Sequence, residues 1–194
     1  MNLHDFDYFY NGAGVGVADL NNDGLLDIYF AGNQVEDKLY INKGNFEFRD
    51  ISIEANLNPL EGWSNGVSFV DINEDGFLDI YISRGGPLEP SQRENLLYVN
   101  QGDETFIEKA RDYGLADQGF STQSAFFDFD QDGDVDIFVG SRSVPGVYGI
   151  DPKHLLLEND GKGNFTNVID KKAFKLNATG MITDAVWEDI DNDG

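Results

Sequence analysis

The stretch "DLNNDGLLDIY", residues 19–29, places several acidic and amide side chains in one short turn, directly before an apolar run. The same frame returns as "DINEDGFLDIY" at 71–81 and "DFDQDGDVDIF" at 128–138, and it begins again as "DIDNDG" at 189–194. The first aspartates of the four copies fall at 19, 71, 128 and 189, which are 52, 57 and 61 residues apart. Repetition at this period predicts a chain built from similar structural units.

Each unit has the pattern of four short strands. In the first unit we expect strands at 14–20, 26–31, 38–42 and 46–51, where β-branched and aromatic residues run between Gly, Asn and Asp. The segments "NKGN", "NQGD" and "NDGKGN" favour hairpin turns. Helix is expected only as single turns near "ISIEANL" and "KARDYGL". A sandwich of unrelated hairpins is the alternative, but the repeat favours an all-β fold of four-stranded antiparallel β-propeller blades.

The expected blades span about 12–52, 65–112 and 122–171, with the start of a fourth at 183–194 and no separate second domain. Closed propellers typically have about four to eight blades, so three blades cannot close a ring. The fourth motif also stops at Gly194, before its last expected ligand. We therefore expect the chain to be a fragment of a larger propeller.

The repeated frame predicts a calcium loop. Positions 1, 3, 5 and 9 carry carboxylate or amide oxygens, position 6 is glycine, and position 7 would offer a backbone carbonyl. Oxygen ligands around a sharp glycine turn suit Ca²⁺, and a bidentate Asp at position 9 with water would complete the shell. The predicted metal-binding residues are Asp19, Asn21, Asp23, Leu25 and Asp27; Asp71, Asn73, Asp75, Phe77 and Asp79; Asp128, Asp130, Asp132, Asp134 and Asp136; and, in a truncated fourth site, Asp189, Asp191 and Asp193.

Other interpretations of the loops are weaker. An EF-hand needs Glu at position 12 and flanking helices, whereas position 12 is Phe30, Ile82 or Val139 and the flanks alternate like strands. Magnesium rarely uses an all-protein cage. An acidic turn on the surface without a metal could explain a single copy of the motif, but three copies at equivalent places in a repeat argue against it. We expect about three complete Ca²⁺ sites, with the side chains of Glu74 and Asp134 facing solvent.

Composition excludes several classes of function. The formal net charge is −23, from 36 acidic residues against 13 Lys and Arg, which argues against nucleic acid as a partner. The chain has no cysteine, so disulfides, zinc thiolate sites and cysteine nucleophiles are excluded. No stretch of 18 apolar residues is present to span a membrane, and no P-loop or G-x-S-x-G motif occurs.

The frame D-x-[DN]-x-D-G-x-x-D, followed by an apolar strand, resembles the FG-GAP or VCBS repeat and the calcium loops of integrin α propellers. The stretches "GWSNGVSFVDINEDG" and "GMITDAVWEDIDNDG" are similar to large bacterial, Bacteroidetes-type proteins that also carry an ASPIC/UnbV region. Cartilage acidic proteins are the animal relatives of that group. The resemblance implies a propeller, calcium in the first inter-strand loop of each blade, and an extracellular or outer-surface location. It implies no reaction.

The function expected from these patterns is a calcium-stabilised, non-catalytic scaffold for adhesion or for binding a surface protein or glycan. A lectin-like propeller and a propeller domain of a polysaccharide lyase or hydrolase are the alternatives. The unit-specific loops "GGPLEPSQRE" and "SVPGVYGIDPK" are the expected binding rim. We also expect Trp63 and Trp187 in the core and His154 at a loop edge. Candidate contacts on the rim are Arg84, Arg93, Arg142 and Tyr148.

Overall fold

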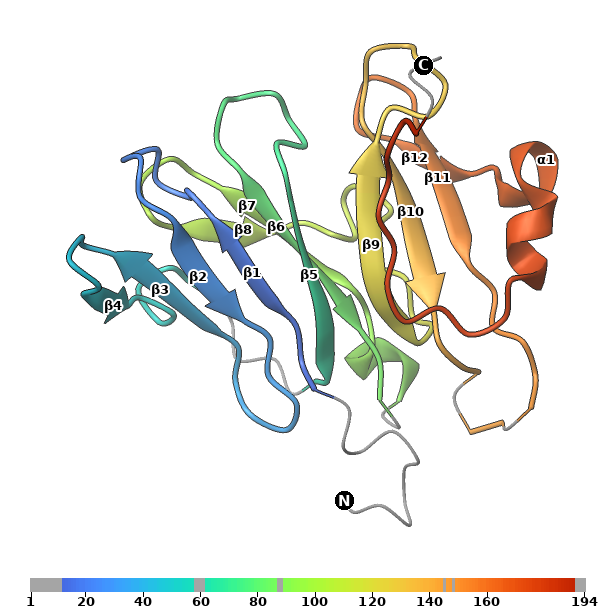
Figure 1. Cartoon of the computed structure of the whole chain (residues 1–194), viewed down its shortest axis with the longest axis horizontal. Helices are drawn as coiled ribbons and strands as arrows, with labels where there is room; N and C mark the ends of the chain where they lie inside the picture. The colour runs from blue at the N-terminus through green and yellow to red at the C-terminus, as the bar shows by residue number, and fades with distance from the viewer. Residues whose placement is uncertain (1–11, 58–61, 87–88, 145, 148, 191–194) are drawn as a thin grey trace.

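The computed structural model describes residues 12–57, 62–86, 89–144, 146–147 and 149–190. It contains three antiparallel four-stranded sheets, in each of which consecutive strands pair. We call these sheets blades 1, 2 and 3, and Figure 1 shows them side by side in chain order. The strands are β1 (Val15–Ala18), β2 (Asp27–Phe30), β3 (Lys38–Asn42) and β4 (Phe48–Asp50); β5 (Ser64–Val70), β6 (Asp79–Arg84), β7 (Leu96–Asn100) and β8 (Phe106–Glu108); β9 (Ser121–Phe127), β10 (Asp136–Ser141), β11 (Leu155–Asn159) and β12 (Phe165–Asn167).

This arrangement confirms the predicted all-β fold of four-stranded antiparallel blades, which do not close into a ring in this chain. The strands of blade 1 lie within the four predicted ranges. The single turns expected after the fourth strands are also present, because Ala55 N bonds to Ile51 O and Leu115 N bonds to Ala110 O, both at 2.7 Å.

The apolar core lies between the blades. Tyr29, Leu39 and Ile41 of blade 1 share one buried cluster with Ile82 and Tyr98 of blade 2. A second buried cluster lies on the other side of blade 2, between blades 2 and 3. Its members include Tyr81, Leu97, Val99, Ile137, Val139 and Leu157. Each middle strand therefore buries side chains on one or both faces, which is why the strands read as apolar runs.

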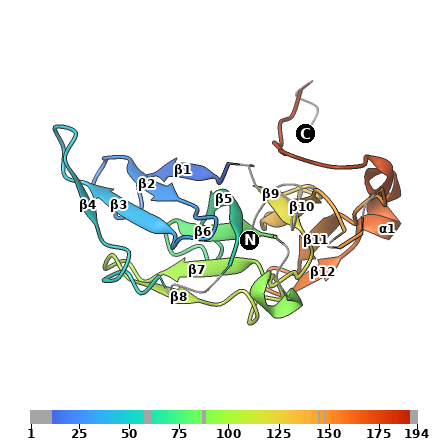
Figure 2. The ribbon, with the colours of Figure 1, turned by 90° about the horizontal axis from the view of Figure 1, so that it is seen from below.

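The first strands of blades 2 and 3 adjoin at the centre of the molecule (Figure 2). Asn65 Nδ2 donates to Ser121 O at 2.7 Å, and Ser68 Oγ donates to Ser124 O at 2.6 Å. Gly66 permits this approach, because a Cβ there would lie 2.3 Å from the carbonyl oxygen of Thr122. Small and polar residues in the first strands thus allow blade-to-blade contact.

Short helical elements cover the outer face of blade 3. These are α1 (Ile169–Lys172) and the 3-10 helix η2 (Phe174–Ala178); a further 3-10 helix, η1 (Pro90–Gln92), lies in the β6–β7 loop. Ile169 and Val168 pack with Leu156 of β11 in a third cluster. Neither α1 nor η2 was predicted, because four or five residues are too few to show helical periodicity. No helix among the described residues is long and apolar enough to cross a membrane.

The chain after η2 returns to β9 (Figure 1). Ile182 N donates to Ser141 O at 3.1 Å, as Ser64 N does to Gly32 O at 3.1 Å between blades 1 and 2. Trp187 stacks on Phe127 with ring centroids 3.8 Å apart. Residues 182–187 therefore occupy the place where the first strand of a next blade would begin. Trp187 is exposed, so the expectation of core packing is wrong for it, whereas Trp63 is buried as expected.

Candidate metal centres

The three complete acidic loops join the first strand to the second strand of each blade and share one backbone conformation. Position 4 has a left-handed φ of 57° at Asn22, 57° at Glu74 and 62° at Gln131. Position 6 has φ of 84° at Gly24, 88° at Gly76 and 100° at Gly133. A positive φ outside glycine is uncommon, so its recurrence shows that the frame encodes one specific turn.

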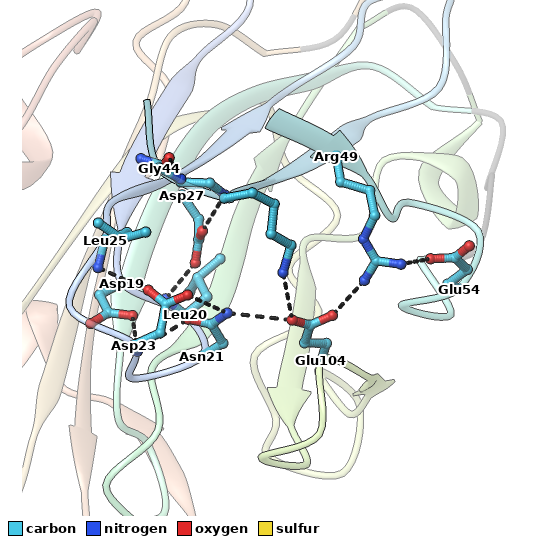
Figure 3. A network of polar contacts seen from close by, with 12 residues as sticks. Asp19, Leu20, Asn21, Asp23, Leu25, Asp27, Gly44, Arg49, Glu54 and Glu104 are labelled. Atoms are coloured by element: carbon cyan, nitrogen blue, oxygen red, sulfur yellow. Dashed lines mark hydrogen bonds and ion pairs between the residues drawn. The ribbon is translucent and has the colours of Figure 1, made fainter. Parts of the chain in front are cut away.

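Carboxylates at positions 1 and 5 hold this turn (Figure 3). Asp19 accepts the backbone N–H of Asp23 at 3.1 Å and that of Gly24 at 2.8 Å, and Asp23 accepts the N–H of Leu25 at 2.9 Å. The equivalent bonds recur in the other loops, from Asp75 N, Gly76 N and Phe77 N in blade 2 and from Asp132 N, Gly133 N and Asp134 N in blade 3. Their carboxyl groups thus line the inside of the turn.

The position 9 aspartates are fully buried: Asp27, Asp79 and Asp136 are each 0% exposed. Asp79 accepts the N–H of Ile72 at 2.9 Å and that of Asn100 at 2.7 Å. Asp27 and Asp136 make the matching pairs, with Leu20 and Asn42 at 2.9 Å each and with Phe129 and Asn159 at 3.1 and 2.8 Å. Each Asp therefore ties its loop to the end of the third strand, a role that the sequence did not reveal. Each carboxylate oxygen keeps a second lone pair, so this role leaves metal ligation open.

Burial raises the pKa of all three position 9 carboxyl groups, and for Asp79 the pKa rises to about 6. The negative charges of Asp75 and Asp71 add to this rise, while the two backbone N–H donors oppose it. Desolvation and like charge both disfavour the ionised form, and a bound cation would offset both.

An asparagine at the end of each third strand supports the loop from behind. Its Nδ2 donates to the backbone carbonyl of position 8 in the loop, and its Oδ1 accepts the N–H of a glycine in the following hairpin. The asparagine, the position 8 residue and the glycine are Asn42, Leu26 and Gly44 in blade 1; Asn100, Leu78 and Gly102 in blade 2; and Asn159, Val135 and Gly163 in blade 3. Asn100 also donates to Leu20 O of blade 1 at 2.8 Å. The repeated Asn was visible in the sequence, but its link between blades was not.

The third loop passes the most direct test of fit to a cation. Carboxylate oxygens of Asp128, Asp130 and Asp136 lie within 4.8 Å of one another, the one such group of three found in the described part of the chain. Oxygen-only donors of this kind match Ca²⁺. Asp134 Oδ1 is buried without a hydrogen-bond donor, so the expectation that this side chain faces solvent is wrong, whereas Glu74 is exposed as expected. The first two loops have Asn at position 3 and so offer three carboxylates each.

Position 3 differs among the blades in its surroundings. Asn21 lies 3.4 Å from Glu104, which reaches over from the β7–β8 hairpin of blade 2 and pairs with Arg49 at 2.7 Å and Lys43 at 3.4 Å (Figure 3). Asn73 donates to its own loop, at 2.9 Å from Asp75 Oδ2. In the third loop position 3 is Asp130, and its carboxylate accepts a hydrogen bond from the ammonium group of Lys172.

The remaining predicted site residues are placed differently. Asp189 of the fourth loop is exposed, and Asp191 and Asp193 lie outside the described residues, as does Tyr148. Arg84 and Arg93 are buried rather than available on a rim, and Arg142 is half-buried. His154 lies at a loop edge as expected, directly before β11, but it is only 1% exposed and accepts the N–H of Ser141 at 3.1 Å.

A half-buried carboxylate that links blades 1 and 2 was also missed. Asp37, in the β2–β3 loop, accepts Tyr29 Oη at 2.8 Å, Gly32 N at 2.6 Å and Ser64 Oγ of blade 2 at 3.0 Å. Burial raises its pKa against the effect of these donors and of nearby Arg84. Nothing in its local sequence, "VEDK", distinguishes it from a surface acid.

Four-stranded blades that each carry one acidic glycine turn between their first two strands define a repeat protein of the propeller-blade class. The FG-GAP-like repeat model matches residues 19–82 and 88–139, and the chain belongs to this family.

Three similar proteins align with most of the chain. Human cartilage acidic protein 1 is 27% identical over 198 residues, covering 95% of this chain, and the mouse protein of that name is 26% identical over the same length. The Xenopus tropicalis protein is 27% identical over 144 residues, covering 71% of this chain and 21% of its own length. The chain spans 28% of the length of the human and mouse relatives.

Proposed function

We propose that the protein is a calcium-stabilised β-propeller scaffold. The observation that carries this proposal is the threefold recurrence of one oxygen-lined turn with a buried Asp at position 9. Such an Asp is costly to ionise in its metal-free state, as the raised pKa of Asp79 indicates. The same unfavourable ionisation occurs at the equivalent Asp of all three blades. This recurrence favours a cation bound in each loop over an unrelated cause in each blade.

In this proposal the metal is structural. Residues at positions 1, 3, 5 and 9, with the carbonyl of position 7, would hold Ca²⁺ in each loop. Bound Ca²⁺ would supply positive charge between the first and second strands, so its binding free energy would add to that of folding. We propose an extracellular or outer-surface location, as the resemblance to FG-GAP repeats implies. At such a location we expect Kd about 10⁻⁴ to 10⁻³ M, the range of extracellular calcium modules.

We further propose that the scaffold is non-catalytic and serves adhesion, or the binding of a surface protein or glycan. The half-buried Asp37 and the buried Asn95 and His154 make hydrogen bonds within or between blades, which is a structural use. The β6–β7 and β10–β11 loops differ from blade to blade, and the latter exposes Val147 and Ile150. We propose these loops as the partner-binding rim.

A calorimetric titration tests the metal assignment. We expect Ca²⁺ to bind at about three sites and Mg²⁺ to bind far more weakly. Asp75→Asn should remove one site, because it discharges position 5 of the second loop. Glu47→Gln is the matched control, since it removes one exposed negative charge outside the loops. Absence of calcium heat in the wild type, or equal site numbers in both variants, would contradict the proposal.

A further inference from the structure

The ammonium group of Lys172 lies against the third acidic loop. Lys172 is the last residue of α1, and its Nζ is 2.8 Å from Asp130 Oδ2 and 2.5 Å from Glu158 Oε2. The same Nζ is 4.7 Å from the ring centroid of Phe129. Phe129 and Asp130 are positions 2 and 3 of the loop, so a cation supplied by the chain itself is held at the candidate metal centre.

A packed element delivers this lysine. Ile169, at the start of α1, is buried, and it shares an apolar cluster with Leu156 of β11. Phe129 and Leu176 pack against that cluster, so the loop and both short helices contact the same apolar surface. Apolar packing thus holds the backbone of α1 in place, and two carboxylates hold the ammonium group of Lys172.

The third loop is unlike the other two in this respect. Position 3 is a neutral amide in the first and second loops, and the described partner of Asn21 outside its loop is the carboxylate of Glu104. In the third loop position 3 is Asp130, which brings the acidic side chains at positions 1, 3, 5 and 9 to four and pairs with an ammonium. The extra charge of the loop and the lysine that meets it occur together.

We propose that Lys172 is an internal competitor for the third metal site, so that calcium binding at this loop and docking of α1 oppose each other. The inference rests on the calcium binding proposed above. Asp130 would have to serve both cations, and an ammonium so close to a divalent ion repels it. Because linkage is reciprocal, calcium in the third loop weakens the docking of α1 by the same factor by which docked α1 weakens calcium binding.

A titration of the full 194-residue chain with Ca²⁺ alone tests this competition. Asp19→Asn and Asp71→Asn together discharge position 1 of the first two loops and leave the third loop to be measured. In that background Lys172→Met, which keeps an apolar stem, should tighten calcium binding by about fivefold or more. Lys171→Met is the matched control, because it removes the same charge from an exposed neighbour on the same helix and should change little.

Hydrogen exchange on the otherwise wild-type chain gives a second readout that does not depend on the double variant folding. Calcium should speed exchange of the amides at 169–178, and Lys172→Arg, which keeps the charge, should behave like the wild type. The competition would be overturned if the two Met variants bound calcium at the third loop with equal affinity and calcium left the exchange rates unchanged. If the first two loops still bound calcium, the scaffold proposal would stand. No calcium binding in any variant would overturn both.

Discussion

At the level of single residues, the environment of Asp79 has two opposing effects on the ionisation of its carboxyl group. Its carboxylate accepts one backbone N–H from its own loop, that of Ile72, and one from the end of β7, that of Asn100, and it is fully buried. The two hydrogen bonds favour the ionised form, whereas burial and like charge disfavour it. Asp27 and Asp136 stand in the same position, so the conflict recurs in every complete blade.

Replacing Asp79 by Asn should destabilise the protein with or without calcium. The amide can accept only one of the two N–H groups cleanly, and the other loses its acceptor in a buried site, which costs about 1–3 kcal/mol. Asp75→Asn is the matched change in the same loop at an exposed position, and it should matter mainly when calcium is present. Urea unfolding in calcium and in chelator measures both. Equal losses for the two variants in chelator would contradict the role assigned to Asp79.

The raised pKa of Asp79, about 6, predicts an unusual pH dependence for the metal-free protein. Its unfolded-state pKa is about 4, so the folded state binds the proton more tightly. The penalty for ionising this group is therefore absent below about pH 4 and fully present above about pH 6. Metal-free stability should fall as the pH rises from about 4 to about 6, measured by urea unfolding in calcium-depleted buffer. Asp79→Asn should reduce that fall, and an unchanged pH profile in the variant would contradict the assignment.

At the level of elements, side chains that cross between blades couple neighbouring loops. Asn100 donates to Leu20 O of blade 1 and to Leu78 O of its own blade, while Asn22 of the first loop donates to Gly76 O of the second. Asn42, at the equivalent place in blade 1, donates to Leu26 O within its own blade. The repeat therefore keeps the local bond and adds an inter-blade bond in blade 2.

Asn100→Ala should cost more stability than Asn42→Ala. The first change leaves two carbonyl groups without this donor, one of them in the neighbouring blade, and the site is buried. The second leaves one carbonyl at a partly exposed site. We expect an additional loss of about 1 kcal/mol or more for Asn100→Ala by urea unfolding. A larger loss for Asn42→Ala would show that the inter-blade bond contributes little.

The sequence predicted elements better than it predicted contacts between them. The strands followed from runs of β-branched and aromatic residues between turn residues, and the loop conformation followed from the fixed Gly at position 6. The burial of Arg84 and His154 could not be predicted, because both depend on how blades and later segments pack. Lys172 reaches Asp130 across 42 residues of sequence, and no local pattern around "IDKK" indicates that contact.

At the level of the whole molecule, the two outer faces differ. Blade 3 is covered by α1 and η2 over its apolar cluster. Blade 1 leaves apolar side chains exposed on its outer face, among them Val15, Val17 and Phe30. Val67 and Ile82, which hold the places of Val15 and Phe30 in blade 2, are buried against blade 1. The outer face of blade 1 thus has the character of a blade interface.

A matched pair of substitutions tests this reading of the two faces. Val67→Ser removes apolar contacts from a side chain that is 8% exposed and should cost about 2 kcal/mol. Val15→Ser changes the equivalent side chain at 56% exposure and should cost under about 0.5 kcal/mol. Urea unfolding of both variants at one calcium concentration makes the comparison. A comparable loss for Val15→Ser would mean that its face is covered in solution.

The central claim is that the acidic loops are structural calcium sites, and thermal and urea unfolding of the 194-residue chain in calcium, magnesium and chelator tests it most directly. Each site at about 100 times its Kd should add about 2.7 kcal/mol of stability. We predict a large fall in stability in chelator, recovered by calcium and not by magnesium. Equal stability in all three conditions would contradict the claim, because the repeated carboxylates would then be held by the protein's own hydrogen bonds alone.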